Sequence, residues 1–322
     1  MALQRTLPSP AALAAALLLA ACGSTPPAAG GVRLAAPGGE PPAFAADADA
    51  LRAELESWRG LRFRDELVVE LVPADHVEDP KLNGWYESRT KRLVVVEGKS
   101  DAMGRGTLLH EMFHALQDQH FDLARLHREA EPLGPDARRA LRALIEGEAM
   151  LAVSELMSYD FERHAKLPAA GPLDPERFEK LFHYGAGLRF VRALREAGGW
   201  ERVDAAFRDP PRSTAEILHP ERYPRRERAL PPGWRGDAPA DARARGELEL
   251  WLLLAGPTEL RPRAAELAAH LRADVAWEAG AGLKWRLLFD APGAAAEAAA
   301  AAEMAGARAA VDGALVTLVL ES

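Results

Sequence analysis

The stretch from Leu108 to Leu116 reads LLHEMFHAL and contains the HExxH pattern, with His110, Glu111 and His114. Its other residues are apolar, which is typical of a helix buried in a core. Residues four positions apart lie on one face of a helix, so both imidazoles can bind one cation while Glu111 points toward a water on it. Zinc suits neutral imidazole, and its catalytic sites take three protein ligands and a water. The stretch therefore predicts a helix that carries Zn2+.

A third ligand must come from elsewhere in the chain. His120 follows His114 by six residues, but Gln117 occupies the position at which a glycine would turn the chain back. If the helix continues, His120 lies about 9 Å along the axis and about 120° around it from His114, out of reach of the same metal. A glutamate ligand is therefore favoured.

Two glutamates on the next helical stretch are candidates for that ligand. Glu146 and Glu148 stand among apolar residues, where carboxylates are rare unless they are paired or bind a metal. They lie about 200° apart on a helix, so only one can face the site. Each lies near an edge of the apolar stripe, and the periodicity does not choose between them.

Two strings resemble known zinc peptidases. EGEA, which begins at Glu146, resembles the gluzincin aminopeptidases, in which the first glutamate of Glu-Gly-x-Ala is a zinc ligand. HEMFHALQD, which begins at His110, is similar to the metal helix of thermolysin. The resemblance covers about 50 residues and implies Glu146 as third ligand, Glu111 as general base and Asp118 as a residue that supports a ligand. The interval from His114 to Glu146 is longer than in either family.

The chain also resembles a group of bacterial lipoproteins and secreted proteins. Members share HALQDQHFDL, here beginning at His114, then an EGEA helix, and then a segment that reads STAEILHP from Ser213. In the gluzincins a His or Tyr donates to the oxyanion of the reaction. His219, Tyr184 and His183 are the candidates, and for each the alternative is an ordinary structural role.

The N-terminal residues have the pattern of an export signal. Arg5 precedes a small apolar run over residues 11–21, which is shorter than the roughly 20 residues that span a bilayer. LAAC, which ends at Cys22, resembles the bacterial lipoprotein box, and lipidation explains a single cysteine in an exported chain. We expect a signal peptide over residues 1–21 and a flexible tether over 22–46. The protein is then expected in the cell envelope, lipid-anchored at the outer membrane or on the periplasmic face.

Hydrophobic periodicity and turn residues divide the rest of the chain into blocks of helices and strands. We expect helices over residues 47–58, 107–126, 136–159, 175–197, 240–255, 262–271 and 294–305. We expect strands over residues 66–72, 84–86, 93–96, 275–277, 284–289 and 314–320. Separate blocks indicate an α+β fold.

The domain prediction follows from these blocks. We expect a mainly helical, zincin-like catalytic domain over residues 47–225 and a smaller C-terminal α+β subdomain over 240–322. A β-hairpin over 85–96 lies beside the HExxH helix, where its edge strand either pairs with substrate or is an ordinary strand of the sheet.

The composition narrows the function. The chain has 322 residues and a net charge of -8, which argues against nucleic acid because phosphate binding needs surplus Lys and Arg. The sequence predicts a zinc metallopeptidase that acts on a peptide or protein. Two alternatives remain open: a non-catalytic envelope binding or assembly lipoprotein with a peptidase-like fold, and a zinc amidase that acts on cell-wall amides.

Overall fold

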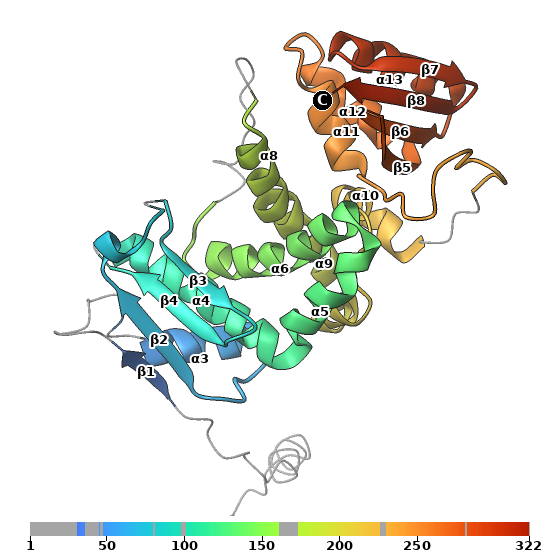
Figure 1. Cartoon of the computed structure of the whole chain (residues 1–322). Helices are drawn as coiled ribbons and strands as arrows, with labels where there is room; N and C mark the ends of the chain where they lie inside the picture. The colour runs from blue at the N-terminus through green and yellow to red at the C-terminus, as the bar shows by residue number, and fades with distance from the viewer. Residues whose placement is uncertain are drawn as a thin grey trace, which may run out of the picture.

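The computed structural model describes residues 31–35, 45, 48–79, 81–97, 101–160, 173–225, 230–280 and 282–321. These residues form a mixed helix and sheet structure, as the predicted α+β class requires. Two sheets lie at opposite ends of the molecule with a layer of helices between them (Figure 1). The predicted signal peptide, Cys22 and most of the predicted tether lie outside the described residues.

The first sheet has the strand order β1-β2-β4-β3. Its strands are β1 (Val32–Ala35), β2 (Leu67–Val72), β3 (Gly84–Glu87) and β4 (Arg92–Val96). β1, β2 and β4 run parallel, whereas β3 is antiparallel to β4 and forms an edge. A short 3-10 helix, η1 (Ala74–His76), follows β2.

β1 corrects the prediction that residues 22–46 are all tether. Val32 pairs with Leu67 of β2, and its backbone N–H donates to Asp49 Oδ1 at 2.8 Å. Its short apolar sequence lies among Pro and Gly residues and gives a weak strand signal on its own. The partner strand and the carboxylate provide the hydrogen bonds that make it a strand.

Two helices, α3 (Ala48–Arg59) and α4 (Asp101–Phe121), pack on the first sheet. β2 buries alternate residues, as a strand with one covered face does. The apolar residues that flank the HExxH pattern on α4 pack against β2 and β4 and form the hydrophobic core of this part of the molecule. Its fully buried members include Leu108, Leu109, Met112, Phe113, Leu116, Val69 and Val95.

The helix that carries the HExxH pattern begins and ends about five residues earlier than the sequence predicts. Its predicted range runs to residue 126, but α4 ends at Phe121 and Asp122 takes a left-handed φ of 55°. Asp122 Oδ1 then accepts a hydrogen bond from Arg125 N and caps α5 (Leu123–Ala130). This N-cap stops one helix and starts another, because it satisfies a backbone N–H that has no partner inside the new helix.

The central layer is helical. It contains η2 (Glu131–Leu133), α6 (Pro135–Leu156), α8 (Pro175–Leu181), the π-helical η3 (Phe182–Ala186), α9 (Gly187–Arg208), α10 (Thr214–Leu218) and η4 (Pro220–Arg225). The sequence predicts that a helix ends at Gly198 and Gly199. Both residues have non-helical dihedrals, so one helical segment of α9 ends there as predicted, and a second segment follows directly and runs to Arg208.

The second sheet has the antiparallel order β5-β6-β8-β7. Its elements are α11 (Glu247–Leu254), α12 (Arg261–Ala269), β5 (Leu271–Ala279), β6 (Gly282–Phe289), α13 (Pro292–Met304), β7 (Arg308–Asp312) and β8 (Leu315–Glu321). The three helices bury alanine and leucine side chains against the sheet around Trp285. β7 was not expected, because four of its five residues are exposed and it lacks an apolar alternation.

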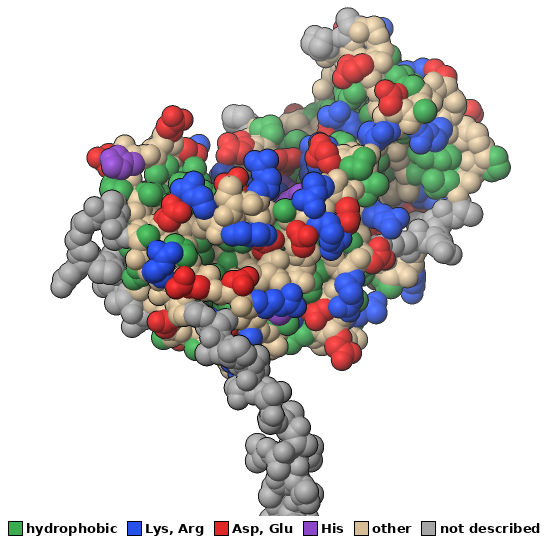
Figure 2. All heavy atoms as spheres, turned by 60° about the horizontal axis from the view of Figure 1, so that its bottom comes forward, with side chains coloured by type: hydrophobic (Ala, Val, Ile, Leu, Met, Phe, Trp, Pro, Cys, Tyr) green, Lys and Arg blue, Asp and Glu red, His purple; other side chains and the backbone are tan. Residues whose placement is uncertain are grey.

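The surface has charges of both signs. Figure 2 shows Lys and Arg side chains interspersed with Asp and Glu side chains on the face that it draws. Among the residues that the structure describes, no helix is both long and apolar enough to span a bilayer.

Candidate metal centre

α4 and α6 bring three side chains to one point between them. His110 Nε2 lies 3.0 Å from His114 Nε2 and 3.2 Å from Glu146 Oε2, and His114 Nε2 lies 3.3 Å from the same oxygen. The side chains are 15%, 10% and 13% exposed, so the cluster is shielded but still open to water. These donors form a group that can hold a metal ion.

The charge of this cluster favours a cation. Burial would raise the pKa of the Glu146 carboxyl, but hydrogen bonds from the two histidines outweigh it and hold that pKa well below its usual range. Burial lowers the pKa of His114, yet Glu146 outweighs this effect and raises it to about 9. The same negative field that favours a proton on His114 also attracts a metal cation.

Gln117 fixes the orientation of the His114 ring. The Gln117 Nε2 group donates to Ile145 O at 3.0 Å and to Glu148 Oε2 at 2.8 Å, so both of its protons are used. Its Oε1 atom therefore faces His114 Nδ1, 2.8 Å away, and accepts the proton of that nitrogen. When the ring is neutral, as a metal ligand must be, this contact leaves the lone pair on Nε2, which faces the cluster.

Glu148 belongs to a buried ion pair rather than to the ligand group. Its side chain is 0% exposed, and its Oε1 accepts from Arg59 Nε at 2.5 Å. Arg59 also bonds to Asp204, and its guanidinium lies 4.4 Å from the centre of the Trp200 ring. Of the two glutamates that the sequence left open, the structure thus brings Glu146 to the histidines and Glu148 to Arg59.

Gly147, between these glutamates, lets two helices touch. A Cβ on Gly147 would lie 2.1 Å from the backbone carbon of Gly187 at the start of α9, and a Cβ on Gly187 would lie 2.1 Å from Ala143 O. Each of these three consecutive residues therefore contacts a different part of the structure. Glu146 contacts the histidine pair, Gly147 contacts helix α9, and Glu148 contacts Arg59 and Gln117. This crossing places η3, which directly precedes α9, beside the cluster.

Tyr184 of η3 lies next to the histidine pair. Its ring centre is 6.2 Å from that of His110, with the two planes nearly perpendicular. Burial raises the pKa of its hydroxyl, and the charges of Glu146 and Glu111 raise it further, so the group keeps its proton at neutral pH. His183, beside it, is buried, and burial lowers its pKa to about 4; among the described residues its Nε2 has no hydrogen-bond partner.

Glu111 lies on the side of α4 that faces the edge strand β3. It is buried, and a Cβ placed on Gly84 would lie 3.5 Å from its Cγ. The same Cβ would lie 2.7 Å from both Thr107 Cγ2 and Val94 O, so only glycine lets β3 approach the helix this closely. The edge strand and the carboxylate are therefore held side by side.

Two histidines suggested by the sequence have other partners. His219 Nε2 lies 2.7 Å from Glu247 Oε1, a buried carboxylate on α11, and its role as oxyanion donor stays a prediction. His120 Nε2 donates to Arg62 O at 2.8 Å, away from the cluster. Neither histidine is in the ligand group.

Asp118 forms hydrogen bonds with the β3–β4 hairpin and not with either histidine of the cluster. Its Oδ2 accepts from the Tyr86 hydroxyl and from Lys91 Nζ, both at 2.6 Å, and its Oδ1 accepts from Leu123 N at 2.9 Å. The ligand support that the resemblance assigned to it is provided by Gln117. The role of Gln117 was not predicted from the sequence, although Gln117 follows His114 by three residues and therefore lies on the same face of the helix.

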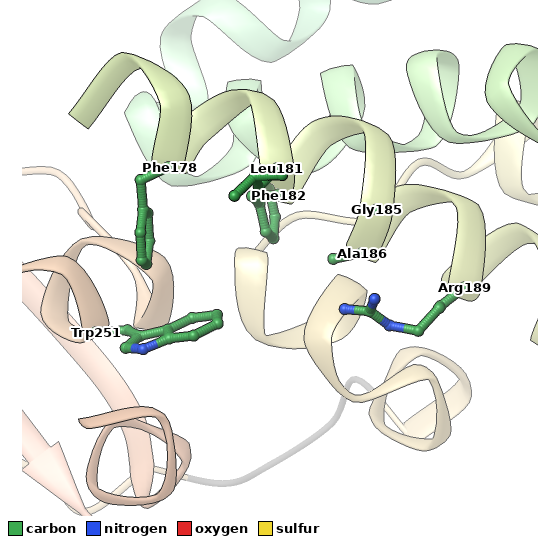
Figure 3. A pocket seen from close by; sticks show the side chains of 7 residues that line it. All are labelled: Phe178, Leu181, Phe182, Gly185, Ala186, Arg189 and Trp251. Atoms are coloured by element: carbon green, nitrogen blue, oxygen red, sulfur yellow. The ribbon is translucent and has the colours of Figure 1, made fainter. Parts of the chain in front are cut away.

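A separate pocket lies between the central helices and α11. Figure 3 shows Phe178 and Phe182 pointing toward Trp251, with Arg189 directed into the same space. Its lining contains none of the three ligand residues, so it is not part of the metal centre.

Comparison of the chain with protein-family models, with curated proteins and with solved structures found no match. Any function assigned to the site must therefore be argued from its own geometry and chemistry.

Proposed function

We propose that this protein is a zinc-dependent metallopeptidase of the gluzincin type with a zincin-like catalytic domain. The observation that carries the proposal is the convergence of His110 Nε2, His114 Nε2 and Glu146 Oε2, with Glu111 on the same helix as the histidines. Ligands about 2.0–2.2 Å from a tetrahedral zinc lie roughly 3.3 Å from one another. The three observed separations, 3.0, 3.2 and 3.3 Å, fit that geometry.

Zinc held by these residues supplies a Lewis acid and brings the pKa of a water close to neutrality. Glu111 is the general base in this proposal, because it is the carboxylate of the metal helix that is not a ligand. Tyr184 keeps its proton and lies beside His110, which suits a donor to the oxyanion that forms during amide hydrolysis. Gln117 holds His114 in the tautomer that the metal requires.

The edge strand β3 is the proposed platform for the substrate. An extended peptide can add to the free edge of a sheet through backbone hydrogen bonds. β3 forms the edge nearest Glu111, because Gly84 packs against that side chain. A peptide paired with β3 would therefore pass close to the proposed base.

The proposal includes export and lipid anchoring through Cys22. Its support is the LAAC string and the absence of a second cysteine in the sequence. Growth with radiolabelled palmitate should label the chain, and Cys22→Ala should abolish the label and release the protein from the membrane fraction. Equal labelling of both forms would contradict the anchor and leave the metal site unaffected.

The test of the activity combines metal content with turnover. We expect about one zinc per chain, cleavage of a broad peptide library, and loss of cleavage in Glu111→Gln with zinc retained. Turnover only on cell-wall fragments would favour the amidase, and binding of an envelope protein without turnover would favour the assembly module. Failure of the chain to bind zinc after reconstitution would contradict the proposal.

A further inference from the structure

We propose that Arg142 binds a carboxylate of the substrate, and that the site prefers peptides whose free C-terminal carboxylate lies one or two residues beyond the cleaved bond. This inference rests on the proposed peptidase function and adds its substrate class. Arg142 precedes Glu146 by one turn of α6, so the two side chains project from the same face of the helix.

The Glu146 carboxylate separates Arg142 from the ligand group. Oε2 of Glu146 faces the two Nε2 atoms, whereas Oε1 lies 3.6 Å from Arg142 Nε. The guanidinium thus reaches the edge of the cluster without competing for the atom that would bind the metal.

The guanidinium is also available to a ligand. The Arg142 side chain is 55% exposed, and within the described part of the chain it has no hydrogen bond and no ion pair other than the 3.6 Å contact with Glu146. The other arginines of α6 differ in this respect, since Arg138 pairs with Glu131 and Arg139 pairs with two glutamates. A free guanidinium fork matches a carboxylate through two parallel hydrogen bonds.

The charges around the site favour an anion there. A divalent cation and Arg142 together carry one positive charge more than Glu146 and Glu111 neutralise. Burial and the charge of Arg142 lower the pKa of His127 on α5 and of His183 on η3, so the flanking imidazoles are neutral at pH 7. The remaining positive charge is concentrated on Arg142 and attracts an anionic group of the substrate.

The reach of Arg142 sets where that group lies. A metal on Glu146 Oε2 would be roughly 6–8 Å from Arg142 Nε, given about 2 Å for the metal–oxygen bond, the width of the carboxylate between Oε2 and Oε1, and 3.6 Å from Oε1 to Nε. An extended residue spans at most about 3.3–3.6 Å. A carboxylate on Arg142 is therefore one or two residues from the carbonyl at the metal, which fits release of a single amino acid or a dipeptide.

The test uses the full-length, zinc-loaded chain and paired peptides that differ only in a free or amidated C-terminus. We expect kcat/KM about 10- to 100-fold higher for the free acid, the factor given by a charge-assisted hydrogen bond. Arg142→Ala should bring the ratio near one, and Arg142→Lys should keep part of it. Arg138→Ala, which removes an exposed arginine one turn earlier, is the matched control and should leave the ratio unchanged.

A second readout does not depend on turnover. Calorimetry of a dipeptide with a free or amidated C-terminus is done on zinc-loaded Glu111→Gln, with and without Arg142→Ala. We expect the acid to bind about 10-fold more tightly, and only when Arg142 is present.

The outcomes are distinguishable. Equal rates and equal binding for acid and amide would overturn the inference and leave the peptidase proposal standing. A preference for internal Glu over Gln that depends on Arg142 would overturn the C-terminal assignment, and so would zinc loss in Arg142→Ala, which would make the arginine a support for Glu146. If no peptide is cleaved, the peptidase proposal fails, while the calorimetry still decides whether Arg142 binds a carboxylate.

Discussion

Gln117 Oε1 lies 2.8 Å from His114 Nδ1, so one amide determines which nitrogen of the proposed metal ligand carries the proton in its neutral form. The amide is itself held by Glu148 and Ile145 O, which links the ligand to the buried Arg59 ion pair. Partners of this kind set the orientation and basicity of a ligating histidine.

Gln117→Leu should weaken zinc binding by about 10- to 100-fold, because His114 loses the acceptor that fixes its tautomer. Competition with a fluorescent chelator measures the zinc dissociation constant directly. Gln119→Leu is the matched control: Gln119 is on the same helix, but its side chain accepts from Arg64 N and not from a ligand. An unchanged zinc dissociation constant in Gln117→Leu would show that the hydrogen bond does not support the site.

Glu146→Gln and Glu148→Gln should fail in different ways. Glu146→Gln should lose zinc and leave the Arg59–Glu148 ion pair intact, because Glu146 lies at the histidine cluster. Glu148→Gln should lower the free energy of unfolding by about 3 kcal/mol, since it removes the charged partner of Arg59 Nε in a fully buried ion pair and leaves only Asp204 to neutralise Arg59. Urea unfolding and metal analysis on both variants decide between these roles, and zinc loss without destabilisation in Glu148→Gln would reverse them.

The helix around His110 and His114 could be predicted from the sequence because the same nine residues determine how it packs and which side chains it presents to a cation. Apolar residues around His110 and His114 had to be buried, and the spacing of the histidines required a helix. The choice between Glu146 and Glu148 could not follow from periodicity, because both side chains face the protein interior. Only the fold reveals that Arg59, far earlier in the chain, neutralises Glu148.

Other features could not be predicted either, because they depend on contacts or backbone conformations that no local sequence pattern indicates. His219 was a candidate oxyanion donor, and no local pattern indicates that its ring pairs with Glu247, 28 residues later. The end of α4 depends on Asp122, whose left-handed conformation is uncommon for a residue other than glycine. β1 depends on a parallel partner 35 residues away, and parallel pairing leaves no turn signal.

Gly84→Ala should reduce turnover by disturbing the contact between β3 and α4. The added Cβ would lie 2.7 Å from Thr107 Cγ2 and from Val94 O, so the edge strand must move away from Glu111. We expect kcat/KM to fall about 10- to 100-fold, as small displacements near a reacting centre do, with zinc content unchanged. Gly293→Ala, where an added Cβ meets no atom within 4 Å, is the control and should keep full activity.

The pH dependence of stability should depend on Asp136, at the start of α6. Burial, reinforced by the charge of Asp274 on β5, raises the pKa of Asp136 to about 7, and its Oδ1 accepts from the backbone and hydroxyl of Thr214. Between about pH 4 and pH 7 the unfolded chain has this group ionised while the folded chain keeps the proton. The folded state then binds more protons, so the free energy of unfolding falls as pH rises, by up to about 1.4 kcal/mol per pH unit.

Asp136→Asn tests this linkage, because its amide oxygen can still accept from Thr214 but cannot ionise. The free energy of unfolding, measured in urea from pH 4 to pH 8, should fall less steeply in Asp136→Asn than in the parent chain. The exposed Asp312→Asn serves as the matched control and should follow the parent. Parallel curves for the parent and Asp136→Asn would mean that Asp136 is already ionised in the folded protein. In that case the carboxylate pair between α6 and the second sheet would be held by hydrogen bonds strong enough to offset its burial.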